Sequence, residues 1–181
     1  DMGGTTAKAA IIKGGRALVS KSHEVARVRR FKKGSGLPVG IPVMDLLAIG
    51  AGGGSIAEIN DLGLIQIGPR SAGAEPGPVC YQRGGTEPTV TDADVVLGYL
   101  NPEFFLGGDM TLDEEAARRA IEMKIGKPLG MDLMTSAAAI SRMVMENMAE
   151  AARVHSVEMN VDIRRHGLIA FGGAGPVHAY G

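Results

Sequence analysis

The chain has 181 residues, of which 45% are hydrophobic and 22% charged, and its formal net charge is −1. This is the balance of an ordinary globular domain, without the basic excess of a nucleic-acid-binding protein or an acidic tail. Its single cysteine excludes an internal disulfide and predicts a cytoplasmic protein, and no apolar run approaches the ~20 residues of a membrane span. The 27 glycines point to tight turns and close backbone approaches, where phosphates bind.

The first fifty residues predict short antiparallel strands joined by turns. Residues 9–12 form a short apolar run that is expected to be buried, and Gly14-Gly15 suits the positive φ of a hairpin turn. Residues 25–31 are expected to add a third strand. The basic residues from 27 to 33 predict a solvated face or, alternatively, a contact with an acidic partner. After a polar loop, the apolar residues 41–49 predict a buried strand or a short helix.

A glycine-rich middle separates these strands from the helices. The glycines of Gly50–Ser55 exclude a regular element there. Residues 68–90 are predicted to be mostly loop, and a loop of this length inside a compact domain is usually functional or mobile. Thr91 and Asp94 have the spacing of a capping box, with Asp in place of the usual Glu or Gln, so a helix is expected to begin there.

Two further helices and a strand are predicted in the C-terminal part. The first helix spans residues 111–125 and is stopped by Gly126 and Pro128. The second extends from about residue 136 to 157 and buries one face, because its apolar residues recur at helical spacing. Residues 167–171 form a short apolar strand that runs directly into a glycine turn.

The opening segment Asp1–Thr6 has the residues of a phosphate-binding hairpin. The glycine pair Gly3-Gly4 lets backbone N–H groups converge on one point, and such a nest attracts anions. Thr5 and Thr6 add hydroxyl donors, and the carboxylate of Asp1 can hold Mg²⁺ through water. The alternative is an ordinary hairpin turn with an incidental aspartate.

A second glycine turn lies near the C-terminus. Gly172, Gly173, Ala174 and Gly175 follow the predicted strand and precede Pro176, which suits the first turn of a helix. Such a turn lets a flat ligand approach the backbone, and the helix N-terminus adds a favourable dipole. A tight strand-to-helix turn is the alternative. The segment has no G-x-G-x-x-G dinucleotide fingerprint, and the chain has no P-loop sequence.

Together the two turns resemble those of the second half of the ATPase fold shared by actin, heat-shock chaperones and sugar kinases. Asp1–Thr6 is similar to the second phosphate hairpin of that fold, and Gly172–Gly175 is similar to its adenosine turn. The intervening sequence narrows the resemblance to the hydantoinase A/oxoprolinase family, and the resemblance runs the length of the chain. The segments that carry it are Gly50–Ala57, Gly68–Tyr81, Pro88–Asp94 and Gly172–His178.

The resemblance implies an α/β chain of the ribonuclease-H-like, actin-like ATPase class with an inserted glycine- and proline-rich loop region. Residues 1–181 would form a single hydantoinase A-type domain, a fragment without the first phosphate hairpin and the C-terminal part. The expected chemistry uses ATP and Mg²⁺ to activate a cyclic amide (a hydantoin or 5-oxoproline) or a ketone by phosphoryl transfer, for hydrolysis or carboxylation. The expected partner is a hydantoinase B-type subunit or domain in a hetero-oligomer. A non-catalytic nucleotide switch is the alternative, although it has no evident need for the region Gly50–Thr91.

The same resemblance implies residue roles. Asp1, Thr5 and Thr6 are expected to be catalytic, with Asp1 as the magnesium ligand. The residues expected to contact the nucleotide are Gly3, Gly4, Gly172, Gly173, Ala174 and Gly175. The residues expected to contact the substrate are Gly53, Gly54, Ser55, Asp92 and His155.

Several polar residues have a structural interpretation as well. Asp92 and Asp94 suit either a cation site or the capping box. His155 suits either catalysis or a partly buried position near the end of its helix, and His178 either approaches the nucleotide or lies on a helix surface. Cys80 is expected to be a packed thiol, because Cys and His do not recur at zinc spacing.

Overall fold

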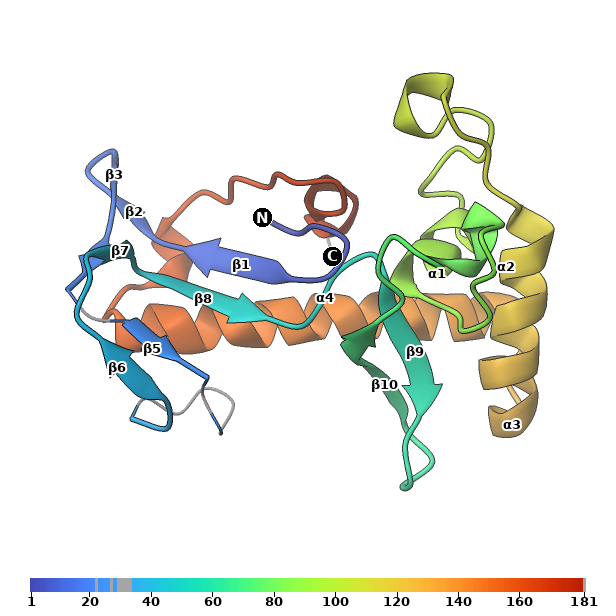
Figure 1. The fold of residues 1–181 in the computed structure, drawn as a ribbon, viewed down its shortest axis with the longest axis horizontal. Helices are drawn as coiled ribbons and strands as arrows, with labels where there is room; N and C mark the ends of the chain where they lie inside the picture. The colour runs from blue at the N-terminus through green and yellow to red at the C-terminus, as the bar shows by residue number, and fades with distance from the viewer. Residues whose placement is uncertain (22, 27, 29–33, 181) are drawn as a thin grey trace. The chain divides into compact units, whose positions relative to one another are not determined.

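The fold is known from a computed structural model, which describes residues 1–21, 23–26, 28 and 34–180 (Figure 1). The chain is mixed α/β and divides into two compact units. The first unit comprises Asp1–Ala7, Ile49–Ala149 and Leu168–Gly181, and the second comprises Lys8–Ala48 and Glu150–Gly167. The five basic residues between Arg27 and Lys33, predicted to form a solvated or partner-binding face, lie outside the described residues.

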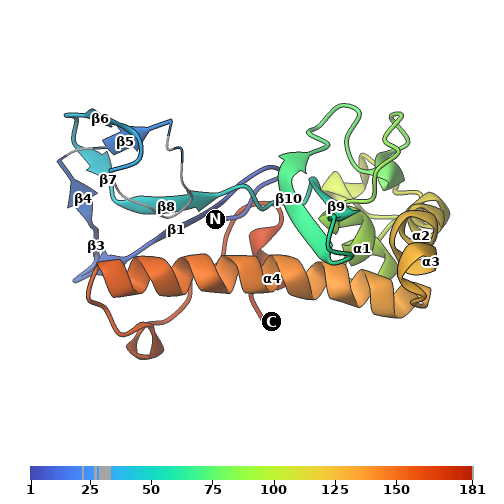
Figure 2. The same ribbon diagram turned by 90° about the horizontal axis from the view of Figure 1, so that it is seen from below.

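The N-terminal region, most of which belongs to the second unit, consists of short strands as predicted (Figure 2). They are β1 (Ala7–Ala10), β2 (Ile12–Lys13), β3 (Arg16–Ala17), β4 (Val19–Ser20), β5 (His23–Val25), β6 (Leu37–Val39), β7 (Val43–Met44) and β8 (Leu46–Ile49). The strands form two-stranded sheets in the pairs β1–β8, β2–β3, β4–β7 and β5–β6. Gly14 and Gly15 form the predicted turn between β2 and β3 with φ angles of 58° and 74°.

Three details of this region differ from the prediction. The run at residues 9–12 is not buried: Ile12 is 51% exposed, because the hairpin that it opens has a ladder of only two residue pairs. The third strand ends at Val25, where Ala26 turns away with a φ of 51°; residue 27 and residues 29–31 lie outside the described part. Residues 41–49 form strands and no helix, but Met44 is 52% exposed.

The long predicted helix is confirmed as α4 (Leu133–Glu158), which contributes residues to both units. It begins earlier than residue 136 because the carboxylate of Asp132 accepts hydrogen bonds from the N–H and the hydroxyl of Thr135, at 2.9 and 2.6 Å. Ile140 and Val144 are fully buried, as the helical spacing predicted. No helix among the described residues has the length and apolar character needed to cross a membrane.

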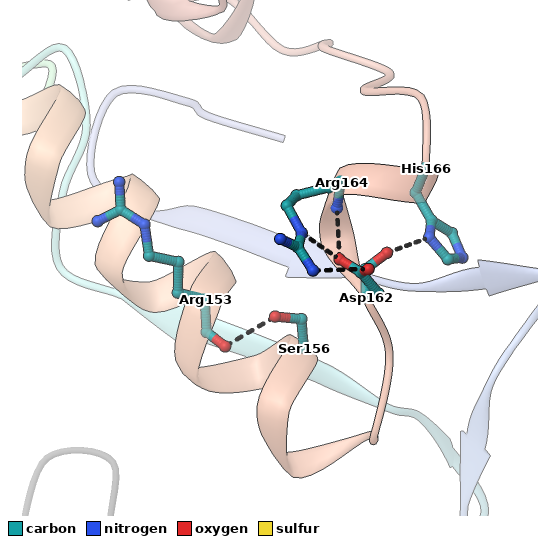
Figure 3. Close-up of polar contacts among 5 residues, drawn as sticks. All are labelled: Arg153, Ser156, Asp162, Arg164 and His166. Carbon is teal, nitrogen blue, oxygen red and sulfur yellow. Dashed lines mark hydrogen bonds and ion pairs between the residues drawn. The ribbon is translucent and has the colours of Figure 1, made fainter.

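The chain after α4 is organised by Asp162 (Figure 3). Its carboxylate accepts hydrogen bonds from the N–H and the guanidinium of Arg164, at 2.9 to 3.2 Å. Its main-chain oxygen lies 3.0 Å from Nδ1 of His166. These contacts hold the short helix η4 (Ile163–Arg165), and the arginine lowers the pKa of the Asp162 carboxyl.

The first unit combines one hairpin with a group of helices. The hairpin pairs β9 (Ser55–Ile59) with β10 (Ile65–Ser71) in antiparallel register. The remaining elements are η1 (Val79–Tyr81), α1 (Val90–Val96), η2 (Leu106–Gly108), α2 (Glu114–Ile121), η3 (Glu122–Gly126), α3 (Lys127–Leu129) and η5 (Gly175–His178). Fully buried apolar side chains from several of these elements and from α4 make up the core, namely Val90, Ala93, Ala117, Ile121, Ile125, Ile140 and Val144.

Helix α1 begins two residues before the predicted capping box. Thr89 is its N-cap: the Thr89 hydroxyl accepts the Asp92 N–H at 3.3 Å, and the Asp92 carboxylate accepts the Thr89 N–H at 2.8 Å. The segment contains two overlapping Thr-x-x-Asp sequences, and the prediction that Thr91 and Asp94 form the capping box was therefore wrong. Thr91 cannot serve as the cap because its hydroxyl donates to the main-chain oxygen of Gly53 instead.

The helix predicted over residues 111–125 also ends differently. Asp113 caps α2 by accepting the Ala116 N–H at 2.8 Å, close to the predicted start. The helix does not stop at Gly126, because the wider turn η3 continues into α3 and places Pro128 in the first turn of that helix, where its missing N–H costs no hydrogen bond. Gly130 ends the whole segment with a φ of 65°.

The strand predicted over residues 167–171 is not formed. Leu168 and Ile169 are 77% and 72% exposed, and no strand of the described chain pairs with this segment. A strand needs a neighbour for its main-chain groups, and here only the Phe171 oxygen accepts a hydrogen bond, from the Met2 N–H. The predicted helix start at Pro176 is confirmed, in the four-residue helix η5.

Candidate functional site

Both predicted glycine turns lie side by side in the first unit, where the N-terminal segment runs next to the C-terminal segment (Figure 1). The N–H of Met2 donates to the Phe171 oxygen at 3.1 Å. The Met2 oxygen in turn accepts the N–H groups of Ala174 and Gly175, at 3.0 and 3.2 Å. Three main-chain hydrogen bonds therefore join segments from opposite ends of the sequence.

The contact between the two turns requires a glycine at position 172. Gly172 has a φ of 93°, a backbone conformation that residues other than glycine rarely adopt. A β-carbon there would overlap the Asp1 carboxylate and lie 2.5 Å from the Met2 oxygen. Asp1 is therefore placed directly beside the second turn, as a shared nucleotide and magnesium site needs.

A third glycine segment packs against the hairpin. The N–H groups of Gly53 and Gly54 donate to the oxygens of Gly3 and Gly4, at 3.0 and 2.7 Å. A β-carbon on Gly52 would lie only 2.6 Å from the Gly4 carbonyl carbon. The glycine run thus supports the hairpin through its own main chain. The contact of Gly53 and Gly54 with a substrate stays a prediction.

Two polar side chains stabilise this glycine run. The hydroxyl of Ser55 accepts the Gly52 N–H at 2.8 Å, so Ser55 closes the turn and is fully buried. Thr91 donates both its N–H and its hydroxyl to the Gly53 oxygen, at 2.8 and 2.9 Å. The first turn of α1 is therefore tied to the segment that holds the hairpin. Thr91 was missed as a site residue, because its partner lies far away in the sequence.

The opposite side of the two turns is open. Gly3, Gly4 and Gly173 have no atom within 4 Å of the position that a β-carbon would take. Among the hydrogen bonds of the described chain, none uses the N–H of Gly4 or of Thr5, and both residues are exposed. The N–H of Gly4, next to open space, fits an anionic ligand such as a phosphate. The nitrogen of Thr5 lies closer to the glycine run, 2.6 Å from the position of a β-carbon on Gly52.

The residues present also fit a magnesium ion bound mostly by water and phosphate. Asp1 is exposed and lies at the junction of the hairpin and the second turn. Within the described residues there is no group of three or more His, Cys, Asp or Glu that could enclose a metal ion. Mg²⁺ typically uses one or two carboxylates plus phosphate oxygens and water, so one carboxylate at this place suffices.

Asp92 has a structural role in this arrangement. It is fully buried, and its carboxylate accepts the N–H groups of Val79, Cys80 and Thr89 together with the Thr89 hydroxyl, at 2.8 to 3.2 Å. These four donors hold the loop before α1 against the helix. The capping interpretation of Asp92 is confirmed, and its contact with a substrate stays a prediction.

His155 is not part of the glycine cluster. It belongs to the second unit, near the end of α4, and is 3% exposed. Its Nε2 has no hydrogen-bond partner among the described residues. His155 is therefore buried more completely than the partly buried position expected as one alternative, and its contact with a substrate stays a prediction.

Asp94 and His178 form a buried pair that the sequence did not reveal. Oδ2 of Asp94 lies 3.2 Å from Nε2 of His178, and the side chains are 2% and 1% exposed. Nε2 of His178 makes no hydrogen bond among the described residues, so this is a close polar contact that becomes an ion pair only when the histidine is protonated. Burial raises the pKa of the Asp94 carboxyl, and His178 partly offsets this effect. His178 is therefore not the surface histidine that was considered.

The one cysteine is inert. Cys80 is buried in η1, and burial raises the pKa of its thiol, an effect that the neighbouring Asp92 carboxylate increases. A thiol with a raised pKa is a poor nucleophile. The packed role expected for Cys80 is confirmed.

Comparison with known proteins agrees with this arrangement. The sequence model of the hydantoinase/oxoprolinase family matches residues 1–181. The chain belongs to the hydantoinase/oxoprolinase family. Within it, the chain is 45% identical over 178 residues to the caprolactamase subunit alpha of Pseudomonas jessenii, covering 98% of this chain and 24% of that protein. It is 49% identical over 144 residues to the acetophenone carboxylase gamma subunit of Aromatoleum aromaticum, covering 79% and 20%.

A solved structure of the family shows the same fold. Acetone carboxylase, described as nucleotide-free and as a catalyst of ATP-dependent acetone carboxylation, matches with a TM-score of 0.86 and 31% identity. The match covers 100% of this chain and 24% of that one. The chain thus spans about a quarter of the length of the family members that it matches.

Proposed function

We propose that this chain forms the adenosine-binding and second phosphate-binding part of an actin-like, ribonuclease-H-like ATPase core. The protein that carries it would be an ATP-dependent enzyme that activates a cyclic amide or a ketone for hydrolysis or carboxylation. The observation that carries the proposal is the joining of Asp1–Thr6 to Gly172–Gly175, with open space on one side of both turns. The relatives include a caprolactamase, whose name supports a cyclic amide as the substrate, and two ketone carboxylases, whose names support a ketone.

In the proposed mechanism the chain's own groups bind and orient the nucleotide. The N–H of Gly4 points its partial positive charge at a phosphate, and the hydroxyls of Thr5 and Thr6 add donors. Gly173 leaves room for the flat adenine ring beside the main chain. Asp1 holds Mg²⁺, which supplies charge neutralisation at the phosphates when bound.

The chemical step that this arrangement would serve is attack of the substrate's carbonyl oxygen on the γ-phosphorus. A phosphorus–oxygen bond forms to the substrate, the bond to the leaving ADP breaks, and the carbonyl carbon becomes open to water or to a carbon nucleophile. Charge stabilisation by positioned donors contributes most of the catalysis in such reactions.

The proposed partner is a hydantoinase B-type subunit or domain. Two relatives similar to this chain are named as an alpha and a gamma subunit, which supports a hetero-oligomer. Because the chain covers about a quarter of those relatives, the remaining parts of the ATP and substrate sites are expected from other segments of the same assembly.

The proposal is tested on the complete protein with its partner, supplied with ATP, Mg²⁺ and a cyclic amide whose carbonyl oxygen is labelled with ¹⁸O. Activation by phosphorylation transfers the label to the released inorganic phosphate, which mass spectrometry detects. Hydrolysis of ATP that neither amides nor ketones stimulate, without label in the phosphate, would support the nucleotide-switch alternative and overturn the enzyme proposal.

A further inference from the structure

The buried pair of Asp94 and His178 lies directly behind the second glycine turn. His178 is the last residue of η5, and η5 begins at Gly175, whose N–H is bonded to the Met2 oxygen. Asp94 is on α1, three residues after Thr91, which holds the glycine run. The pair therefore connects the helix behind the hairpin with the short helix behind the turn.

These contacts form a closed circuit through the first unit. The Gly3 oxygen accepts the Gly53 N–H, and the Gly53 oxygen accepts both donors of Thr91. Helix α1 leads from Thr91 to Asp94, and the ion-pair contact crosses to His178. From there η5 leads back to Gly175, whose N–H donates to Met2, the residue before Gly3. The Asp94–His178 contact is the one place in this circuit where two side chains meet.

Stability alone is a weak reason for such a pair. Oδ1 of Asp94 and both ring nitrogens of His178, Nδ1 and Nε2, are buried with no hydrogen-bond partner among the described residues. Unpaired buried polar atoms are costly, and replacing a buried ion pair with apolar side chains is often neutral or stabilising. A pair that keeps three buried polar atoms without hydrogen-bond partners, next to the proposed adenosine turn, points to a requirement for geometry rather than for stability.

Resting on the proposed nucleotide site, we propose that Asp94 and His178 are positioning residues that fix the distance between the adenosine turn and the phosphate hairpin. Both side chains are almost fully buried, so the pair is expected to act on the nucleotide only through the turn. Without it, η5 keeps its two main-chain hydrogen bonds to Met2 but loses its anchor on α1, and the turn can shift relative to Gly3 and Gly4. Small shifts of a binding turn weaken binding without removing a contact atom.

The test uses the complete protein and three substitutions at the pair. His178→Leu removes the ring nitrogen, His178→Gln keeps a side-chain donor of similar reach, and Asp94→Asn keeps the shape of the acceptor without its charge. Ile121→Val, a fully buried change on α2 at a residue that takes no part in the contacts of the circuit, is the control for a plain loss of stability. ATP affinity is measured by calorimetric titration, KM for ATP and kcat by turnover, and stability by thermal melting.

We expect His178→Leu to weaken ATP binding about tenfold, with KM for ATP rising more than kcat falls, and His178→Gln to restore affinity to within about threefold. Asp94→Asn is expected to behave as His178→Leu does, and it keeps the test decisive if the leucine variant does not fold. Ile121→Val should lower the melting temperature and leave ATP affinity unchanged.

Wild-type ATP affinity in folded His178→Leu or Asp94→Asn, with only the melting temperature lowered, would overturn the positioning role. Failure of the wild-type protein to bind ATP is a different result, because it would remove the proposed nucleotide site itself.

Discussion

The two sides of the glycine turns use glycine for different reasons. On the side where the segments meet, Gly52 and Gly172 have no room for a β-carbon, since it would run into the main chain of the hairpin. On the open side, a β-carbon on Gly4 or Gly173 would meet nothing within 4 Å. The first kind of glycine is required by the fold, and the second kind leaves the space that the proposed nucleotide site needs. Glycine content alone cannot separate these two roles.

The largest effect is expected where the segments meet. Gly52→Ala should destabilise the protein by about 3 kcal/mol, because a methyl group 2.6 Å from the Gly4 carbonyl carbon forces the hairpin away. Gly4→Ala is the matched control and should change stability by less than about 0.5 kcal/mol, since its methyl group faces open space. Urea unfolding of both variants measures the difference. Equal losses would show that the two sides do not differ.

The next effect concerns the ligand. Gly173→Val should weaken ATP binding about 100-fold, because the side chain fills the space expected for adenine, and should leave the melting temperature close to the wild-type value. Calorimetric titration with ATP and a thermal melt on the complete protein give the two readings. Normal affinity with a normal melt would remove the adenosine-turn assignment.

Gly172→Ala is expected to lower the melting temperature instead, because residue 172 has a positive φ.

The smallest effect extends the comparison from glycines to carboxylates. Asp92→Asn should cost about 2 kcal/mol of stability, because its carboxylate accepts four hydrogen bonds inside the fold and the new amide NH₂ would face donors. Asp1→Asn should leave stability unchanged and lower Mg²⁺-dependent ATP turnover strongly. Denaturant unfolding and turnover at varied Mg²⁺ separate the two, with exposed Asp109→Asn as the control. The idea fails if Asp1→Asn turns over ATP normally.

Features that depend on neighbouring residues were predictable from the sequence. The turn at Gly14-Gly15, the long helix α4 and the helix start at Pro176 follow from local conformational preference and spacing. The capping box before α1 was misplaced because two overlapping Thr-x-x-Asp matches stand in the same segment. The choice between them was made by the contact of Thr91 with Gly53, which is tertiary.

Features that depend on distant residues were not predictable. The sequence shows that Gly53 and Gly54 are glycines, but not that their N–H groups are used by the hairpin. It places an aspartate in α1 and a histidine after the second turn, but nothing local indicates that Asp94 and His178 meet. The apolar residues 167–171 do not form the predicted strand for the same reason. A strand depends on a neighbouring strand, which the spacing of apolar residues in the sequence does not specify.

The hydrogen bond from Met2 to Phe171 also has a consequence for how the protein is made. The hairpin at Asp1–Thr6 and its main-chain partner Phe171 lie far apart in the sequence. During synthesis the hairpin can therefore form this contact only after the second turn has left the ribosome. Contacts of such high sequence separation form late and slowly. The proposed nucleotide-binding surface is therefore expected to be the last part of the first unit to assemble. A nascent chain that stops before Phe171 exposes Gly3 and Gly4 without the second turn.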